Sequence, residues 1–283
     1  MQIDKTNSVS FFTCCYEADW EFFLKDGRLK EMINRCSHDF AKKSLIINNV
    51  NNRSEVAYYA LKAIDDGILD NFYFSEDYID EVFKAFSINK RSFILDGYNG
   101  YWYSVAPLTA AYMCSTQYLL YFMGDCIMSE KYKLDWIKHG IVELQKGDVF
   151  TVTPMWNYYN RATENFYSES ELCYYDSGFS DQVFLVKTNN IASKIYNEYN
   201  VKSEIFPIYG GNHFERRVFC YINNHNLKRC VLKNVLYNHE KLMKSNYRSA
   251  IKTNAFKNEV KYVIAKVKKK IRKQNILIKY LLR

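Results

Sequence analysis

Apolar runs and amphipathic stretches alternate along the first 125 residues of the chain. Two short runs rich in aromatic and β-branched residues predict strands, at 9–16 and 44–50. Four longer stretches repeat apolar residues at helical spacing and predict helices, at 20–36, 54–68, 75–86 and 102–114. We expect a break at Gly27, a cap at Ser54 and Pro107 in the first turn of its helix. This alternation predicts an α/β fold with a mostly parallel central sheet flanked by helices.

One stretch, residues 117–128, organises this pattern. Tyr118 to Met123 is an unbroken apolar and aromatic run, which predicts a buried strand in the middle of the sheet. The run ends at Gly124 and Asp125, where α/β sheets bind ligands beyond the carboxyl ends of their strands. A carboxylate there suits a divalent cation and the phosphates it carries. Taken alone, the stretch is also typical of an ordinary Gly-Asp turn, and that simpler interpretation is favoured until other residues are considered.

The pattern after Asp125 is less regular. Helices are predicted at 134–144, 190–199 and 213–224, and strands at 149–154, 181–187 and 204–209. Residues 155–180 are polar, aromatic and irregular, and such a segment in a compact domain is usually functional or mobile. We expect one large domain over 1–245 and a helical tail over 246–283.

The composition indicates a globular protein with a substantial core. The chain has 283 residues, of which 48% are hydrophobic. No early stretch has the pattern of a signal peptide, and no stretch approaches the apolar length of a transmembrane helix. The eight cysteines form no C-x-x-C pair, which favours reduced thiols in the core of a cytosolic protein.

The net charge of +8 is concentrated near the end of the sequence. Residues 254–283 hold ten of the 39 basic residues and one of the 31 acidic residues, so residues 1–253 carry a net charge of −1. An almost neutral body argues against a nucleic-acid-binding protein with a basic face.

Residues 254–283 have the pattern of a basic amphipathic helix. Val260, Ile264, Val267 and Ile271 lie on one stripe, and lysines and arginines occupy the opposite side. Such a helix is suited to lie on an anionic membrane surface, where each basic residue contributes about 1 kcal/mol. A helix packed on the body and a nucleic-acid-binding tail are the alternatives, and the continuous apolar stripe weighs against the second.

Several segments, taken in order, resemble one family. Two early strands end in small polar residues, an apolar strand ends in Gly-Asp, and a later strand opens with Asp-Gln; the residues are Thr13, Asn48, Asn49, Gly124, Asp125, Asp181 and Gln182. Residues 8–240 thereby resemble nucleotide-sugar-dependent glycosyltransferases of the GT-A fold, of the kind that assembles bacterial surface polysaccharides such as lipopolysaccharide and capsule.

The resemblance implies a metal site. The family's signature is an Asp-x-Asp that ends the central strand, and its second Asp holds Mn²⁺ or Mg²⁺ on the donor diphosphate. Asp125 matches that position, whereas Met123 stands where the first Asp would be. A metal-free enzyme that uses cationic side chains is therefore an alternative. The family often supplies a late histidine to the metal, and His213 fits that place better than His239.

The resemblance also implies a donor pocket and a catalytic base. The pocket for the nucleobase and ribose would comprise Thr13, Cys14, Asn49 and Arg53, although asparagines at such positions are also ordinary turn residues. In inverting members, a carboxylate that opens a later element deprotonates the acceptor hydroxyl. Asp181 matches that position best, and its rivals are Asp176, Glu169 and Glu164.

Two aromatic residues are candidates for the acceptor site. Trp156 and Tyr158 have faces that suit sugar rings, or they pack back on the domain. Together these expectations describe an inverting, hexosyltransferase-type enzyme that acts on a lipid-linked glycan at the inner face of the cytoplasmic membrane. Two alternatives stay open: a degenerate transferase that only binds nucleotide or glycan, and a peripheral membrane scaffold.

Overall fold

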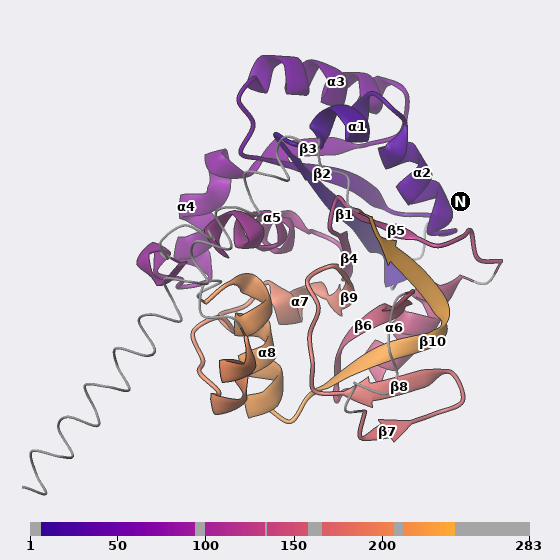
Figure 1. The fold of residues 1–283 in the computed structure, drawn as a ribbon, viewed down its shortest axis with the longest axis vertical. Coiled ribbons are helices and arrows are strands. Elements are labelled where there is room, and N and C mark those ends of the chain that lie inside the picture. The colour runs from indigo at the N-terminus through magenta and orange to yellow at the C-terminus, as the bar shows by residue number, and fades with distance from the viewer. Residues whose placement is uncertain (1–6, 94–99, 134, 158–165, 207–211, 241–283) are drawn as a thin grey trace, which may run out of the picture.

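A ten-stranded sheet with helices on both faces makes up the part of the chain that the computed structural model describes, residues 7–93, 100–133, 135–157, 166–206 and 212–240 (Figure 1). The strand order is β3-β2-β1-β4-β9-β6-β10-β8-β7, and β5 pairs with β10. The strands are β1 Val9–Tyr16, β2 Lys42–Asn48, β3 Asn71–Phe74, β4 Tyr118–Phe122, β5 Cys126–Met128, β6 Val149–Trp156, β7 Ser168–Glu169, β8 Cys173–Asp176, β9 Val183–Lys187 and β10 Lys228–His239.

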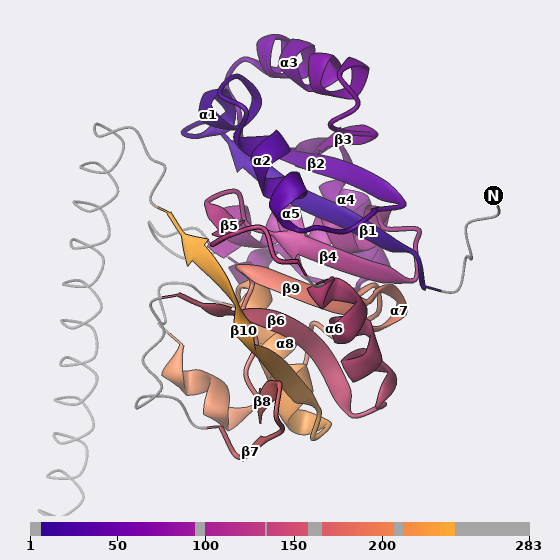
Figure 2. The same ribbon diagram turned by 90° about the vertical axis from the view of Figure 1, so that its right-hand side faces the viewer.

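The helices form one layer on each face of this sheet (Figure 2). One layer contains α1 Trp20–Leu24, α2 Arg28–Arg35, α3 Arg53–Asp65 and α6 Trp136–Gln145. The other contains α4 Ser75–Ala85, α5 Gly100–Met113, α7 Thr188–Ile191 and α8 Phe214–Asn224. All five residues of β4 are buried, and Leu120 faces the first layer whereas Tyr121 faces the second. The apolar run therefore lies inside a sheet covered on both faces, as its sequence predicts.

The sheet is mixed, with a parallel half and a half that alternates in direction. β3, β2, β1 and β4 run parallel, as predicted. β9 is antiparallel to both β4 and β6, and β10 runs parallel to β6. The carboxyl ends of β1, β4, β6 and β10 therefore meet the beginning of β9 at one edge of the sheet. The neighbours of β1 are β2 on one side and β4 on the other, which makes this edge the switch point where such sheets bind ligands.

Several local predictions are confirmed and others are wrong. β1 has the predicted bounds, and the helical stretch 20–36 breaks at Gly27, which has a left-handed φ of 79°. The cap of α3 is Asn52 rather than Ser54, because the Asn52 side chain accepts the N–H of Glu55. Pro107 lies inside α5 and not in its first turn.

Two elements predicted after β9 are wrong. The helix expected at 190–199 is only α7, because Tyr196 instead turns inward and its carbonyl accepts a hydrogen bond from the buried Arg217 (2.6 Å). The strand expected from residue 204 begins as a 3₁₀ helix, Val201–Ile205, and residues 207–209 lie outside the described residues. Among the described helices, none has the length and apolar character needed to cross a membrane. The predicted tail, 246–283, also lies outside the described residues.

Candidate active site

The turn after β4 places Asp125 at the switch point of the sheet. The N–H of Cys126 donates to the carbonyl of Met123 (3.0 Å), which closes a tight turn around Gly124 and Asp125. Gly124 packs against the end of β1, where an added Cβ atom would lie 2.4 Å from the carbonyl oxygen of Cys14. A side chain larger than hydrogen would therefore push the turn away from β1. The glycine keeps Asp125 at the carboxyl edge of both strands.

A histidine from β10 contacts this aspartate. Oδ2 of Asp125 lies 2.8 Å from Nε2 of His239, and their side chains are 30% and 32% exposed. The antiparallel register of β5 and β10 brings them together by pairing His239 with Cys126. A carboxylate oxygen and an imidazole nitrogen that are close together and reachable from solvent fit a divalent cation such as Mn²⁺.

Cys126 completes a cluster around Asp125. Its Sγ lies 3.7 Å from Oδ1 of Asp125, and the ligand atoms of Asp125, Cys126 and His239 lie within 4.8 Å of one another. Burial and the charges of Asp125 and Asp181 raise the pKa of the Cys126 thiol well above its ordinary value. Mn²⁺ and Mg²⁺ bind oxygen and nitrogen ligands in preference to sulfur. Asp125 and His239 are therefore the two ligands that this cluster offers to such a cation.

Asp181 lies at the same edge, two residues before β9. The N–H of Met123 donates to the carbonyl of Gln182 (2.7 Å), which joins the start of β9 to the end of β4. Burial, together with the charges of Glu215 and Asp125, raises the pKa of Asp181 to about 7, against an opposing effect of His213. A carboxyl group that exchanges its proton near neutral pH suits general base catalysis.

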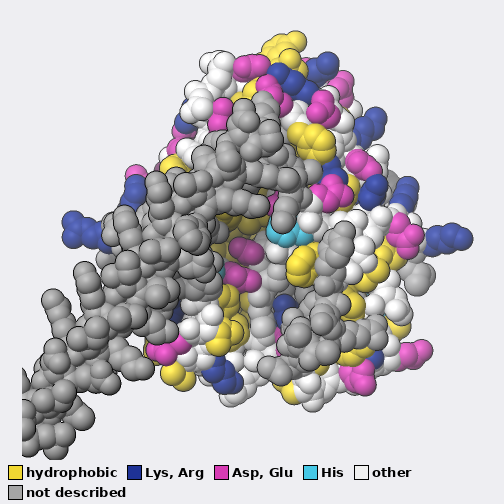
Figure 3. Space-filling view, viewed as in Figure 1, with side chains coloured by type: hydrophobic (Ala, Val, Ile, Leu, Met, Phe, Trp, Pro, Cys, Tyr) yellow, Lys and Arg dark blue, Asp and Glu magenta, His cyan; other side chains and the backbone are white. Residues whose placement is uncertain are grey.

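The two histidines of the metal prediction occupy different places. His213 is the N-cap residue of α8, its Nε2 lies 3.5 Å from the carboxylate of Glu215, and its charge acts on Asp181. His239, which the sequence ranked lower, is the histidine in contact with Asp125. The metal role of His213 stays a prediction. Figure 3 shows acidic and histidine side chains gathered near the centre of this face of the molecule.

The two donor-pocket residues on β1 are largely enclosed. Thr13 is fully buried, and its hydroxyl oxygen has no hydrogen-bond partner among the described residues. The Sγ of Cys14 lies 3.9 Å from Sδ of Met123, and burial raises the pKa of this thiol to about 12. Cys14 therefore packs as a neutral side chain beside the β4 turn.

The two donor-pocket residues after β2 are exposed. Asn49 has a left-handed φ of 51°, and its N–H donates to the carboxylate of Glu76. Arg53 pairs with Asp77, and its guanidinium lies 4.1 Å from the ring centre of Phe74. Both side chains lie beyond the carboxyl end of β2, and their contacts with a nucleotide stay predictions.

The candidates for the acceptor site and for the catalytic base lie at different distances from Asp125 and His239. Trp156 ends β6 with its ring 6.4 Å from that of His239, whereas Tyr158 and Glu164 lie outside the described residues. Asp176 pairs with Arg229 at the start of β10, on the order of 30 Å from His239 at its end. Glu169 pairs with Lys233, midway along β10. Among the described candidates for the base, Asp181 is the one beside Asp125.

The sequence analysis assigned no role in the site to two polar residues that lie there. Asp19 is 5% exposed and accepts the N–H of Tyr16 (2.8 Å), and burial with the charge of Asp125 raises its pKa to about 8. Gln182 accepts the hydroxyl of Tyr237 (2.7 Å), and its side-chain nitrogen lies 3.4 Å from Nδ1 of His239. The sequence pattern places Asp19 in a polar loop, and no feature of the sequence indicates that its side chain is buried.

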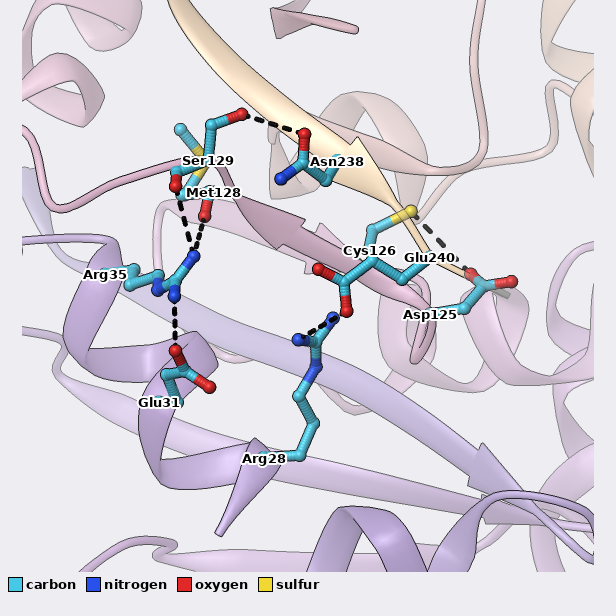
Figure 4. Close-up of polar contacts among 9 residues, drawn as sticks. All are labelled: Arg28, Glu31, Arg35, Asp125, Cys126, Met128, Ser129, Asn238 and Glu240. Atoms are coloured by element: carbon cyan, nitrogen blue, oxygen red, sulfur yellow. Dashed lines mark hydrogen bonds and ion pairs between the residues drawn. The ribbon is translucent and has the colours of Figure 1, made fainter. Parts of the chain in front are cut away.

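Helix α2 supports the strands that carry the cluster (Figure 4). Arg35 donates to two backbone carbonyls at the end of β5 (2.8 and 3.2 Å). Arg28, which is 5% exposed, lies 2.9 Å from the carboxylate of Glu240. The N–H of Glu240 in turn donates to the carbonyl of Asp125 (2.7 Å). These bonds fix the backbone around Asp125 and His239.

No protein-family model matches the chain, and no curated protein sequence does. By structure, the chain is similar to a crystal structure of GalNAc-T7 with UDP, GalNAc and Mn²⁺, with 10% identity and a TM-score of 0.50 over 86% of this chain and 45% of that one. It also matches two crystal structures of S. aureus TarS at 10% identity. One comprises residues 1–349 (TM-score 0.45, 82% of this chain and 60% of that one), and for the other the TM-score is 0.44 over 83% and 37%.

The chain thus spans less than two thirds of the structures it matches. These neighbours are GT-A-type glycosyltransferases, and the likeness to GalNAc-T7 establishes the fold, a mixed α/β sheet of that type. The fold implied by the resemblance in the sequence is therefore confirmed.

Proposed function

We propose that this protein is a glycosyltransferase that uses a nucleotide-sugar donor and a divalent cation, Mn²⁺ or Mg²⁺, held by Asp125 and His239. The contact of these two side chains at the carboxyl end of the central strand carries the proposal. Ligands of α/β sheets bind at this edge, and the GalNAc-T7 neighbour was crystallised with UDP, GalNAc and Mn²⁺. When bound, the cation would offset the negative charge of the leaving diphosphate.

Asp181 is the base in this proposal. In an inverting transfer, its carboxylate accepts the proton of the acceptor hydroxyl while the hydroxyl oxygen bonds to the anomeric carbon and the diphosphate leaves. The sugar is a hexose in this proposal. Trp156, exposed at the end of β6, offers an aromatic face to the acceptor glycan.

The pH dependence of transfer tests the role of Asp181. Only the deprotonated carboxylate accepts a proton, so kcat/KM rises with pH through about 7, the pKa of Asp181 in the free enzyme. Asp181→Asn is expected to lower kcat about 100-fold or more and to remove this rise. Binding of the donor, measured as a shift in Tm, stays unchanged in the variant. A variant that retains the wild-type pH profile would place the base elsewhere.

A donor screen tests the proposal as a whole. UDP-, GDP-, dTDP- and CMP-sugars are added to the protein with and without Mn²⁺ or Mg²⁺, while Tm and donor hydrolysis are measured. One donor is expected to raise Tm in a metal-dependent way. Asp125→Asn and His239→Ala are expected to lose that shift, and Asp65→Asn, an exposed acid on α3, to keep it. No shift with any donor would contradict the proposal.

The acceptor in this proposal is a lipid-linked glycan of bacterial surface polysaccharide synthesis, such as lipopolysaccharide or capsule. Residues 254–283 would bind the anionic inner face of the cytoplasmic membrane and so bring the enzyme to its acceptor. The support is the basic amphipathic pattern of that segment.

A second candidate is a transferase-like protein that binds nucleotide or glycan without catalysis. Met123 favours it, because the family's signature has an aspartate at that position. Binding of a nucleotide-sugar without hydrolysis or transfer, in the same donor screen, would identify this case. A third candidate, a membrane scaffold, would bind vesicles and no donor.

A further inference from the structure

A second group of metal-ligating side chains lies away from β4, between α6, β8 and β10. His139 and Glu143 are four residues apart on α6 and so lie on one side of the helix. Cys173 begins β8, and its Sγ is 4.0 Å from Nε2 of His139. The ligand atoms of these three residues lie within 4.8 Å of one another.

Cys230 adds a second thiol to this group. It lies on β10 opposite Tyr175, which points to the same face of β8 as Cys173 two residues earlier. The thiols of Cys173 and Cys230 lie close enough for each to shift the pKa of the other. Both cysteines are fully buried, and Glu143 is 5% exposed. Three elements that are separate in the sequence thus bring two sulfurs, one imidazole and one carboxylate together inside the molecule.

This ligand set fits zinc. Tetrahedral Zn²⁺ binds thiolate, imidazole and carboxylate at 2.0–2.3 Å, which places ligand atoms about 3.3–3.8 Å apart. The sulfur-to-nitrogen distance of 4.0 Å is close to this spacing. Two thiols disfavour Mg²⁺ and Mn²⁺, which prefer oxygen ligands. The site is therefore chemically distinct from the exposed pair of Asp125 and His239.

Neighbouring groups already orient the carboxylate. The hydroxyl of Tyr175 donates to Glu143 (2.8 Å), and the ammonium of Lys146 lies 2.7 Å from it. Such outer contacts commonly hold metal-binding side chains in place. They also explain how the charge of Glu143 is stabilised at a buried position without a metal.

We propose that His139, Glu143, Cys173 and Cys230 bind one structural Zn²⁺ that ties α6 to β8 and β10. Four protein ligands leave no open coordination position, so this ion would stabilise the fold and take no part in catalysis. The proposal is independent of the glycosyltransferase proposal.

The test is the metal content of the full chain. The protein is produced with added zinc, dialysed against metal-free buffer and analysed by elemental mass spectrometry. Wild type and Asp125→Asn are expected to hold about one zinc per chain. His139→Ala, Cys173→Ser and Cys230→Ser are expected to lose it, and Cys36→Ser, which changes the buried cysteine that caps the C-terminus of α2, to keep it.

Three further measurements test the proposal even if a cysteine variant does not fold. His139 is half-buried, so His139→Ala is expected to retain the far-ultraviolet circular dichroism of the wild type. A strong chelator should lower the Tm of the wild type but not that of His139→Ala. Cobalt-substituted wild type should absorb through thiolate-to-cobalt charge transfer, and the His139→Ala protein should not.

Three outcomes would overturn the proposal. The first is a wild-type protein that holds no stoichiometric zinc even after refolding with Zn²⁺. The second is equal zinc in wild type and His139→Ala. The third is a disulfide between Cys173 and Cys230 in the protein as isolated, since a disulfide removes both thiolate ligands.

Discussion

At the scale of single residues, the turn after β4 depends on one glycine and one buried acid. Gly124 lies where a Cβ atom would overlap the carbonyl oxygen of Cys14. The same added atom would lie 3.5 Å from Oδ2 of Asp19, so Asp19 also packs against the turn. Asp125 is thus held between two strands with little freedom, which suits a metal ligand.

Gly124→Ala tests this close packing. The added methyl group must displace the backbone of β1 or of the turn, so we expect a loss of about 1–3 kcal/mol in the free energy of unfolding. The metal-dependent shift in Tm with donor should also fall, because Asp125 moves. Chemical denaturation and the donor screen measure the two effects.

Gly147→Ala is the matched control. Gly147 has open space around its Cβ position and a φ of 87°, so this substitution costs only backbone strain, about 1–2 kcal/mol. It should leave donor binding unchanged. Wild-type donor and metal binding in Gly124→Ala would contradict the packing argument.

The buried carboxyl group of Asp19 should make the stability of the protein depend on pH. Its pKa is about 8 in the folded protein and about 4 in the unfolded chain, so the folded state binds the proton more tightly. The contribution of Asp19 to the free energy of unfolding is therefore fully present below pH about 4 and is lost as the pH rises towards about 8. Asp19→Asn keeps an oxygen for the N–H of Tyr16 and removes the buried charge.

Unfolding of Asp19→Asn in denaturant at several pH values is the measurement. At pH 8 to 9 the variant should be more stable than wild type by an amount on the order of a few kcal/mol. Below pH 4 the two proteins should be alike. A constant difference at all pH values would mean that Asp19 does not titrate as the structure indicates.

At the scale of elements, the candidate site depends on contacts between pieces of chain that the sequence pattern treats separately. β10 supplies His239, and α2 supports β5 and β10 from one side. The sequence pattern does not predict β10, because its two apolar runs, 231–232 and 235–237, are interrupted by Lys233 and Asn234. The register with β6 shifts between Leu232 and Leu236, so the strand is irregular at this interruption.

Arg35→Met tests the support from α2. The substitution keeps an apolar stem but removes the hydrogen bonds to two carbonyls of the β5 end. We expect a loss of about 1–3 kcal/mol in the free energy of unfolding, because those carbonyls lose their charged partner. Lys30→Met, on the exposed side of the same helix, is the control and should change stability little. Equal stability of the two variants would show that this contact does not support β5.

At the scale of the whole molecule, we expect membrane binding to depend on the basic segment 254–283 and donor binding to depend on the described domain. Deleting 254–283 should abolish flotation with vesicles that contain anionic lipid and leave the donor-dependent shift in Tm unchanged. Replacing Lys268, Lys269 and Lys270 with glutamine keeps the apolar stripe and removes about 3 kcal/mol of attraction, roughly a 100-fold loss of affinity. Flotation of the deletion variant at the wild-type level would rule out this segment as the membrane-binding part.

The sequence by itself determined the fold class, the central position of β4 and the placement of Gly124 and Asp125 at its end. These features depend on periodicity and turn chemistry within a few residues, which a single sequence displays directly. Only the tertiary structure decided which histidine contacts Asp125, because His239 lies 114 residues further along the chain and arrives through the register of β5 with β10.

The tertiary structure also decided where charge is buried and how distant ligands meet. Asp19 and Asp181 have raised pKa values because neighbouring elements exclude water from them, which no local pattern reports. The cluster of His139, Glu143 and Cys173, with Cys230 beside it, likewise forms only when side chains of α6 meet those of β8. The local sequence thus determines which strand carries Asp125, and the pairing of strands determines which side chains surround it.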